Sequence, residues 1–324
     1  MCSHSQAIRS FVAVAVFAFA ATQPPLLQAS AWRKVFPESV PPARSYCAMA
    51  YDPVSKKVLL FGGEGKTGNL NDTWAFDGSN WTQLAPAVAP PVRNGATMAF
   101  DWISKKLIMF GGFNVNTYLQ DTWVWDGATS TWTEIQMKSP PPRATGAMLF
   151  TDPVTGRAIM FGGYNITRPV PVFSDTWLWT GKIWKKLNPA TAPYPRAWGI
   201  ASLDPVRHNV VLTGGTGDTI RTDNTWTWDG NDWTLLSPPT QVGAFIGAGS
   251  TFDPAEQSVV VFGGIGQTWS WTGTDWVQLT PNLSPPAREG VGMAFDPISH
   301  QTLMFGGLIA NGPLSDETWQ LQGK

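Results

Sequence analysis

The sequence is poor in charge, in cysteine and in histidine. Only 14% of its 324 residues are charged, and the formal net charge is −1 with lysine and arginine scattered along the chain. This balance excludes a broad basic surface for nucleic acid or for an anionic membrane. With three histidines and two cysteines, the chain has few of the ligands that metal sites use. We therefore expect no metal ion and no other cofactor.

Long hydrophobic runs are also missing. The one strongly apolar run, residues 11–21, is too short for the roughly 20 residues that a membrane-spanning helix needs. It follows Arg9 and is followed by small residues, which predicts a signal peptide within residues 1–31 that is cleaved after Ala20, Ala29 or Ala31. An uncleaved anchor is the alternative. We expect a secreted or periplasmic protein without a membrane span.

Removal of such a signal peptide would leave one cysteine. Cys47 would then have no partner in the chain, so no intrachain disulfide is expected. Its apolar surroundings (SYCAMAY) indicate a small buried side chain and not a reactive thiol.

Glycine, proline and tryptophan are abundant, with 32, 27 and 18 residues. The glycines contain a pair that recurs six times, at 62–63, 111–112, 162–163, 214–215, 263–264 and 306–307. Successive pairs lie 49, 51, 52, 49 and 43 residues apart. A unit of this size that repeats along the whole chain predicts an array of identical supersecondary modules.

Each repeat contains four short β-rich segments separated by turn residues, here called strands a to d. Strand a is rich in small residues, strand b ends at the glycine pair, strand c alternates tryptophan with smaller residues, and strand d begins with tryptophan. Asp-Pro pairs stand at the a–b turn and Asp-Gly pairs at the c–d turn, as antiparallel hairpins require. The repeat predicts an all-β fold of four-stranded antiparallel blades, a six-bladed β-propeller over residues 32–324.

The two ends of the chain complement each other. The sixth repeat stops after its strand c at residues 318–321, and residues 31–35 match the strand d of the first repeat at 80–84. We therefore expect Trp32 to stand in the last blade, so that the N-terminal strand closes the ring and leaves no open sheet edge.

The repeat resembles the kelch repeat in its Pro-Arg lead-in, its apolar strand ending in Gly-Gly, and its aromatic residue and tryptophan at set distances. The resemblance covers residues 31–324 and implies a propeller that binds partners at the mouth from which the b–c loops, those that follow the glycine pairs, emerge. It says little about activity, because propellers carry many unrelated functions.

Known enzymes of related architecture do not fit the residues. Galactose oxidase shares this propeller type, but its copper site needs two histidines, two tyrosines and a cysteine cross-linked to a tyrosine, whereas His208 and His300 stand at a–b turns of different repeats. The sialidase Asp box needs a serine and a glycine that are absent around the Asp-Thr-Trp triplets. We predict no catalytic residue.

An arginine recurs before strand a, seven positions ahead of the last apolar residue of that strand. It is Arg44, Arg93, Arg143, Arg196 and Arg288, and Phe245 takes its place in the fifth repeat. If strand a lines the axis, these guanidinium groups ring the mouth and could bind carboxylate, sulfate or sugar hydroxyls. The alternative is structural, with each arginine bonded to neighbouring carbonyls or to the aspartate of Asp-Thr-Trp.

Variable b–c loops at the same mouth predict a recognition surface. Its candidate ligand-binding residues are Tyr118, Tyr164, Arg168, Trp198 and Arg221. We expect a monomeric, non-catalytic module that binds a protein, peptide or glycan. Two alternatives stay open: a sugar-acting enzyme, such as a sialic-acid epimerase, lyase or hydrolase, with Glu64, Asp218 or Glu289 as acid or base, and a structural role without a small ligand.

Overall fold

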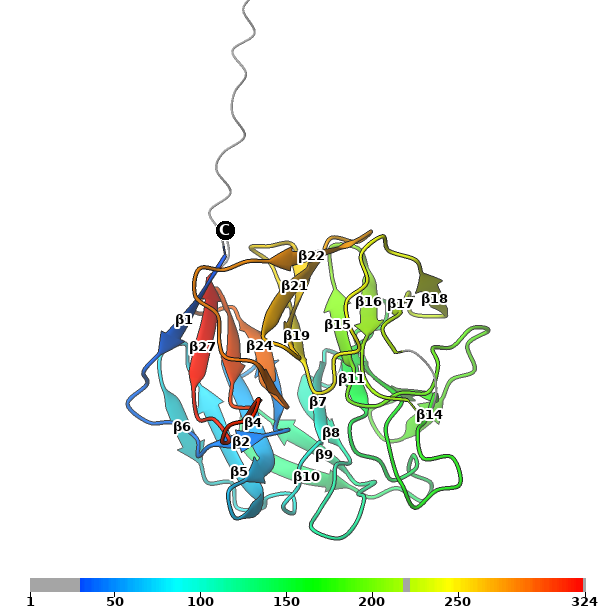
Figure 1. The fold of residues 1–324 in the computed structure, drawn as a ribbon. Coiled ribbons are helices and arrows are strands. Elements are labelled where there is room, and N and C mark those ends of the chain that lie inside the picture. Colours follow the sequence, from blue (N-terminus) through cyan, green and yellow to red (C-terminus); the bar gives the residue numbers. More distant parts are fainter. Residues whose placement is uncertain (1–29, 218–221, 323–324) are drawn as a thin grey trace, which may run out of the picture.

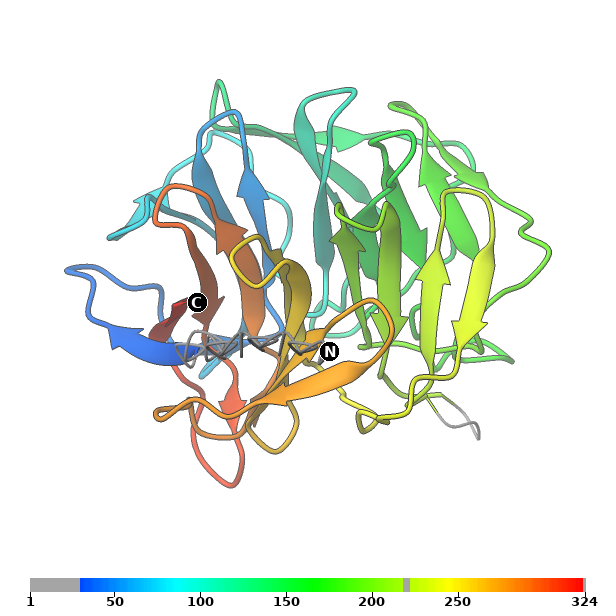
Figure 2. The same ribbon diagram turned by 90° about the horizontal axis from the view of Figure 1, so that it is seen from above.

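The computed structural model describes residues 30–217 and 222–322. These residues form six four-stranded antiparallel blades around a central axis, and they contain no helix (Figures 1 and 2). The predicted six-bladed all-β propeller is confirmed. Within the same part of the chain, none of the secondary structure is a helix long and apolar enough to cross a membrane.

The blades follow one another along the chain, and in each blade the innermost strand comes first. The first three blades are formed by β3 (Ala48–Asp52), β4 (Lys57–Gly65), β5 (Gly68–Phe76) and β6 (Trp81–Leu84), then β7 (Thr97–Asp101), β8 (Lys106–Phe110), β9 (Thr122–Asp126) and β10 (Thr131–Ile135), then β11 (Met148–Thr151), β12 (Ala158–Phe161), β13 (Thr176–Trp179) and β14 (Trp184–Lys186). The last three are formed by β15 (Ile200–Asp204), β16 (Asn209–Thr213), β17 (Thr225–Trp228) and β18 (Trp233–Leu236), then β19 (Gly249–Asp253), β20 (Ser258–Gly263), β21 (Gln267–Trp271) and β22 (Trp276–Leu279), then β24 (Gly292–Asp296), β25 (Gln301–Phe305), β27 (Thr318–Gln322) and β1 (Ala31–Val35). Two short pairings add to these sheets, β2 (Arg44–Ser45) with β4 and β23 (Arg288–Glu289) with β26 (Leu308–Ile309).

The N-terminal strand closes the ring as the sequence predicts. β1 pairs antiparallel with β27 as the outermost strand of the sixth blade, so the two ends of the described chain lie side by side (Figure 1). Trp32 stands opposite Leu321 in this pairing. Closure removes the free edges through which sheets aggregate.

A repeated hydrogen bond joins each blade to the preceding one. The indole N–H of the strand-d tryptophan donates to the hydroxyl of the threonine that precedes the first strand-c tryptophan of the preceding blade, over 2.8–3.0 Å. The six pairs are Trp32–Thr268, Trp81–Thr318, Trp132–Thr73, Trp184–Thr122, Trp233–Thr176 and Trp276–Thr225. A buried indole N–H needs an acceptor, which explains why both residue types recur with the repeat.

The glycine pairs bring neighbouring blades into close contact. Both residues of the first pair have a positive φ, 62° for Gly62 and 104° for Gly63. A Cβ on Gly62 would lie 2.8 Å from the carbonyl oxygen of Arg93 in the next blade, while the N–H of Gly63 donates to that same oxygen. Only glycine combines this backbone conformation with so close an approach.

Candidate functional site

Four of the predicted arginines are buried structural residues and cannot reach a ligand. The side chains of Arg44, Arg93, Arg196 and Arg288 are 0–1% exposed. Each donates from Nε to the carbonyl two residues before it and from Nη1 to the carbonyl of the first glycine of its own blade's pair. The expected ring of ligand-binding guanidinium groups is wrong for these four, and the structural alternative holds.

The third partner of these arginines is the side chain of the residue just before the strand-c threonine. Arg93 forms a two-pronged ion pair with Asp121 at 2.7 Å, and the indole of Trp123 donates to the same carboxylate. Arg44 forms the same kind of ion pair with Asp72. Burial acts to raise the pKa of Asp72, but the hydrogen bonds and the charge of Arg44 have the larger effect, so the pKa is lowered. These aspartates belong to the Asp-Thr-Trp triplets.

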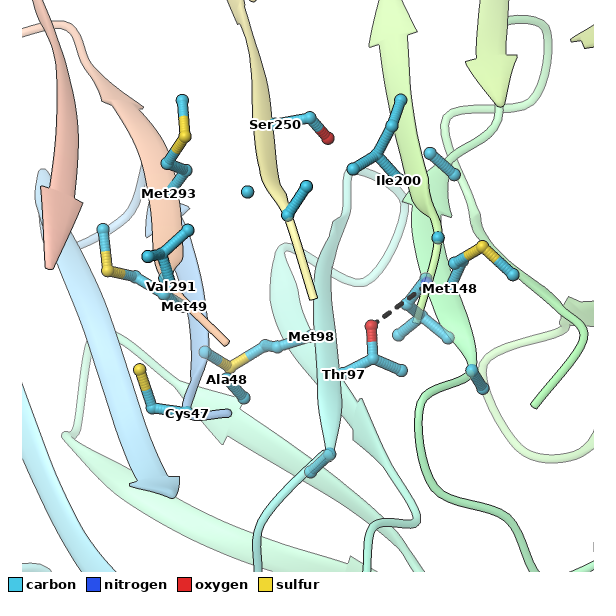
Figure 3. A pocket seen from close by; sticks show the side chains of 18 residues that line it. Cys47, Ala48, Met49, Thr97, Met98, Met148, Ile200, Ser250, Val291 and Met293 are labelled. Atoms are coloured by element: carbon cyan, nitrogen blue, oxygen red, sulfur yellow. Dashed lines mark hydrogen bonds between the residues drawn. The ribbon is translucent and has the colours of Figure 1, made fainter. Parts of the chain in front are cut away.

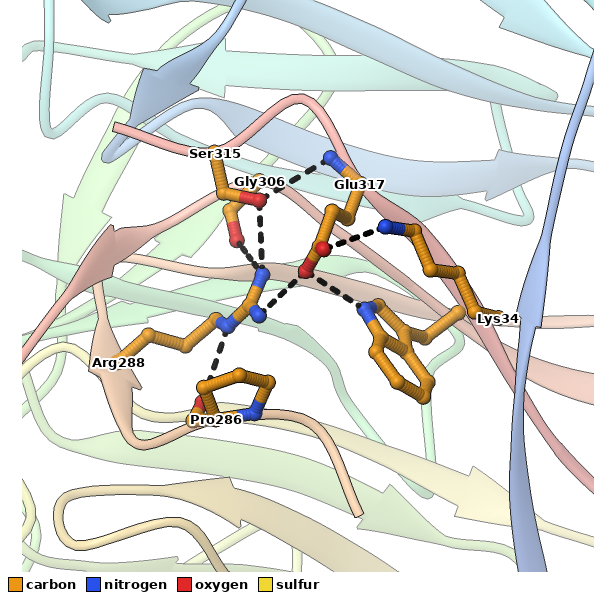
Figure 4. A network of polar contacts seen from close by, with 7 residues as sticks. Lys34, Pro286, Arg288, Gly306, Ser315 and Glu317 are labelled. Carbon is orange, nitrogen blue, oxygen red and sulfur yellow. Dashed lines mark hydrogen bonds and ion pairs between the residues drawn. The ribbon is translucent and has the colours of Figure 1, made fainter. Parts of the chain in front are cut away.

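The sixth blade shows the same network with a glutamate (Figure 4). Arg288 donates to Glu317 at 2.6 Å and to the hydroxyl of Ser315, while Lys34 of β1 pairs with the other oxygen of Glu317. Burial acts to raise the pKa of Glu317, but the hydrogen bonds from Lys34, Arg288 and Trp319 lower it to about 2. Lys34 thereby ties the N-terminal strand to this network.

The third and fifth blades depart from this pattern. In the third blade, Ala144 and not Arg143 stands where the buried arginine stands in other blades. Its carbonyl accepts from the N–H of Gly112, the second glycine of the preceding blade's pair, as the carbonyl of Arg93 accepts from Gly63. Arg143 is exposed beside a cavity of about 220 Å³ that Tyr118 and Asp121 also line. Phe245 is only 5% exposed and packs in the core of the fifth blade. Its expected role as a ligand contact is wrong.

A closed ring of backbone hydrogen bonds surrounds the mouth of the channel. The N–H of one residue per blade donates to the carbonyl of its counterpart in the preceding blade over 2.7–2.9 Å, and the six bonds return to their start. We call these residues the mouth ring; they are Tyr46, Gly95, Gly146, Trp198, Gly247 and Gly290. All six have a positive φ, between 53° and 68°. This conformation favours glycine.

The two members of the mouth ring that are not glycine are aromatic and lie in opposite blades. Trp198 covers Gly146, where an added Cβ would lie 2.7 Å from three ring atoms of the indole. Tyr46 covers Gly290, where an added Cβ would lie 2.9 Å from the phenol ring. A bulky residue at positive φ stores strain, a feature that concentrates at functional sites.

Aromatic side chains extend from Trp198 across the face formed by the b–c loops, here called the loop face. Centroid distances are 5.2 Å from Trp198 to Tyr164, 6.1 Å from Tyr164 to Tyr118, and 5.0 Å from Tyr118 to Phe113. These four half-buried residues form what we call the aromatic row. They come from three blades, so the propeller itself brings them together.

Amide and acidic groups flank the aromatic row. The Asn94 amide donates to Asn69, whose own amide donates to the carbonyl of Phe113. On the other side of the mouth, Tyr46 hydrogen-bonds Glu289; burial first, and then the charges of Glu289 and Glu64, raise the pKa of Tyr46 far above its usual value. The loop face therefore joins an aromatic and amide half to an acidic corner.

The channel below the mouth ring is narrow, and no charged side chain lines it. Its cavity of about 190 Å³ is lined by successive residues of all six innermost strands. Methionines and small side chains form its wall, with Thr97 and Ser250 as polar exceptions (Figure 3). Cys47 lies here, and burial raises the pKa of its thiol to about 11.

The structure gathers part of the predicted site. Tyr118, Tyr164 and Trp198 come together, and Arg143 lies beside Tyr118. Arg168 is exposed in the b–c loop of the third blade. Arg221, like Asp218, lies outside the described residues. His208 and His300 are exposed on a–b turns of different blades, as expected.

Tyr46 was missing from the predicted site. Tyr46 stands two residues after Arg44 as Trp198 stands two after Arg196, so the alignment that selected Trp198 also contained the signal for Tyr46.

Comparison with known proteins gives a family for the fold. The model of the KLHDC2/KLHL20/DRC7 Kelch-repeats domain matches residues 26–179. No curated protein matches the chain. The matched region covers the first two blades and the third as far as β13, and the same strand order, glycine pairs and Trp–Thr bonds continue through the rest of the ring. Kelch propellers generally serve as protein-interaction modules. Residues 26–179 therefore match a kelch-repeat domain, and this match is consistent with a kelch-repeat propeller.

Proposed function

We propose that the chain is an exported, monomeric and non-catalytic binding module that recognises a glycan or a peptide on its loop face. The aromatic row is the observation that carries this proposal. Four adjoining half-buried rings from three blades offer a rigid contact surface at low entropic cost. The amides of Asn69 and Asn94 and the exposed Arg143 and Arg168 supply polar groups around it.

Glycan and peptide arrays, followed by titration of the best ligand, test this proposal. Trp198→Gly is the sharpest variant, because four of the six mouth-ring residues are already glycine and the backbone can keep its conformation. We expect this variant and Tyr118→Ala to weaken binding about tenfold or more, as central aromatic contacts do. Val277→Ser, on the outer strand β22, is the matched control. Absence of any wild-type ligand, or equal affinity of all variants, would refute the proposal.

For the proposed export, the start of the propeller favours cleavage after Ala20 or Ala29 over cleavage after Ala31. Ser30 is buried and donates to Glu256 at 2.6 Å, and Ala31 already pairs with Gln322 in β1. Cleavage after Ala31 would remove both contacts. Mass spectrometry of the protein recovered from the periplasm or the medium tests this, and an intact chain that stays inside the cell would contradict it.

One observation favours the alternative of a sugar-acting enzyme. Tyr46, Glu64 and Glu289 lie together at the mouth. The phenol of Tyr46 is hydrogen-bonded to the carboxylate of Glu289, and such a pair can transfer protons. Turnover of sialylated or uronic-acid substrates that is lost in Glu289→Gln would establish catalysis. Binding without turnover would leave the non-catalytic module in place.

A further inference from the structure

A cleft on the loop face lies beside the aromatic row, between the b–c loop of the second blade and the start of the third blade. One part of it is the cavity of about 220 Å³ that Arg143 and residues 117–121 line. A second cavity of about 130 Å³ adjoins it, because Gln120 and Asp121 line both. We call the two cavities together the side cleft. Tyr118 belongs to the aromatic row and also lines the side cleft, so one ligand can contact both.

Three polar side chains that line the side cleft have no partner in the described part of the protein. They are the exposed guanidinium of Arg143, the half-buried amide of Gln120 and the exposed carboxylate of Glu134, and none of them forms a hydrogen bond or an ion pair there. Amide groups that are removed from water are ordinarily hydrogen-bonded. These three groups are therefore available to a ligand that enters the cleft.

Among the five arginines that precede a strand a, Arg143 alone is exposed. The four equivalent arginines are buried and bonded within their own blades. In the third blade Ala144 stands in their place, and Arg143 lines the side cleft instead. A guanidinium presents two parallel N–H groups that match the two oxygens of a carboxylate. The side cleft thus contains a recognition group for a carboxylate.

The acidic groups around Arg143 leave its positive charge uncompensated. Of the residues that line the first cavity, only Asp121 is acidic, and Arg93 pairs with it through both carboxylate oxygens. Asp175, at the end of the next b–c loop, is paired with a lysine of β14. Glu134 has no such partner among the described residues, but it lines only the second cavity. The side cleft therefore joins a site for a negative charge to a free hydrogen-bond acceptor.

We propose that the side cleft binds a carboxylated sugar, such as a uronic acid unit of an acidic glycan. The carboxylate pairs with the guanidinium of Arg143, and the sugar ring packs against Tyr118. The sugar hydroxyls, which both donate and accept, bond the amide of Gln120 and donate to Glu134. This assignment rests on the proposed function, because it takes the loop face to be a binding surface and names the class of ligand.

An acidic peptide offers the same carboxylate but fits the side cleft less well. A peptide with several carboxylates would place one of them near Glu134, and like charges that meet in an interface oppose association. The hydroxyls of a sugar instead donate to that carboxylate. A neutral glycan would leave Arg143 without a counter-ion. The free acceptor beside the free guanidinium thus favours a ligand with one negative charge and several hydroxyl groups.

Isothermal titration of the purified full chain with trimers of galacturonic, glucuronic and mannuronic acid tests the proposal. Each acid is compared with its methyl ester, which keeps the hydroxyls and removes the charge. We expect at least one acid to bind at least about tenfold more tightly than its ester, because esterification removes the two-pronged pair with the guanidinium. Arg143→Gln should abolish this difference.

Lys138→Gln is the matched control. Lys138 is exposed in the loop that leads to Arg143, it carries the same charge, and it lines neither cavity. We expect this variant to bind the acid as wild type does. Gln120→Ala should weaken acid and ester by a similar factor, because it removes a contact to the hydroxyls and leaves the charge in place.

Failure of this assignment can be told from failure of the proposed function. If glycans or peptides bind and Trp198→Gly weakens them, but no uronic acid is preferred over its ester, the loop face is a binding surface and the assignment of the side cleft is wrong. Equal losses in Arg143→Gln and Lys138→Gln would also overturn it. Tighter binding of an aspartate hexapeptide that Arg143→Gln abolishes would assign the side cleft to an acidic peptide instead. If no ligand binds at all, both proposals fall.

Discussion

The indole N–H of Trp32 donates to the hydroxyl of Thr268 at 2.8 Å, although the two residues stand 236 positions apart. Trp32 belongs to the N-terminal strand, which is the outer strand of the sixth blade, and Thr268 belongs to the fifth blade, so this bond anchors the strand that closes the ring. Trp81 of the first blade and Thr318 of the sixth form the same bond across 237 positions, and the other four bonds join blades that follow one another along the chain. Closure therefore uses the contact that joins every pair of neighbours.

Replacing Trp32 tests the contribution of this closure. Trp32→Phe keeps an aromatic ring but leaves the buried Thr268 hydroxyl without its donor, and we expect a loss of about 1–3 kcal/mol in the free energy of unfolding. Trp132→Phe, which breaks the equivalent bond to Thr73, is the matched control at an interior junction. Urea denaturation measures both. An unchanged midpoint for Trp32→Phe would show that the N-terminal strand does not hold the ring closed.

The two kinds of arginine should separate by stability. Arg93→Ala leaves the half-buried Asp121 without its counter-ion, and we expect a loss of about 3 kcal/mol or more. Arg143→Ala should change stability by less than about 0.5 kcal/mol, because its side chain is exposed. Thermal unfolding of the two variants checks this. Similar melting temperatures would mean that Arg143 also has a structural role.

Most of the fold could be predicted because its signals are local and repeated. The glycine pairs, the turn aspartates and the strand-d tryptophans each have one backbone or packing reason that holds in every blade, and Trp32 carried the closure. The arginine position was harder, since a buried ion pair and a ligand contact select the same residue type. Only the three-dimensional contacts of Arg93 with Asp121 decide between them.

The site was less accessible to prediction for two physical reasons. In the third blade the mouth-ring glycine, Gly146, stands three residues after Arg143, whereas it stands two residues after the arginine elsewhere. The chain from Arg143 to the turn residue Asp152 is one residue longer than the chain from Arg93 to Asp101, so the structural position falls on Ala144. The aromatic row joins residues of three blades, and no local pattern encodes such a contact.

The Arg288 network should make stability depend on pH in acid. The pKa of Glu317 is lowered from 4.5 to about 2 in the folded protein, so its contribution is fully present above pH about 4.5 and is lost as the pH falls toward about 2. Glu317→Gln should remove this part of the acid sensitivity while lowering stability at neutral pH. Melting temperatures between pH 2 and 7 measure it. A variant with the same acid profile as wild type would contradict the shift.

Gly146→Ala should disturb the aromatic row through Trp198. Gly146 has a φ of 63°, and an added Cβ would lie 2.7 Å from three atoms of the indole. Gly68→Ala is the control, because Gly68 also has a positive φ but no atom within 4 Å of an added Cβ. Backbone strain should cost each variant about 1–3 kcal/mol, and Gly146→Ala should lose more because the indole must move. In the Trp198→Gly background, Gly146→Ala should no longer cause this additional loss of stability. A double-mutant cycle in urea denaturation measures the coupling energy between the two residues. Additive effects would show that Trp198 does not rest on Gly146, and the aromatic row would then lack the support that the mouth ring gives it.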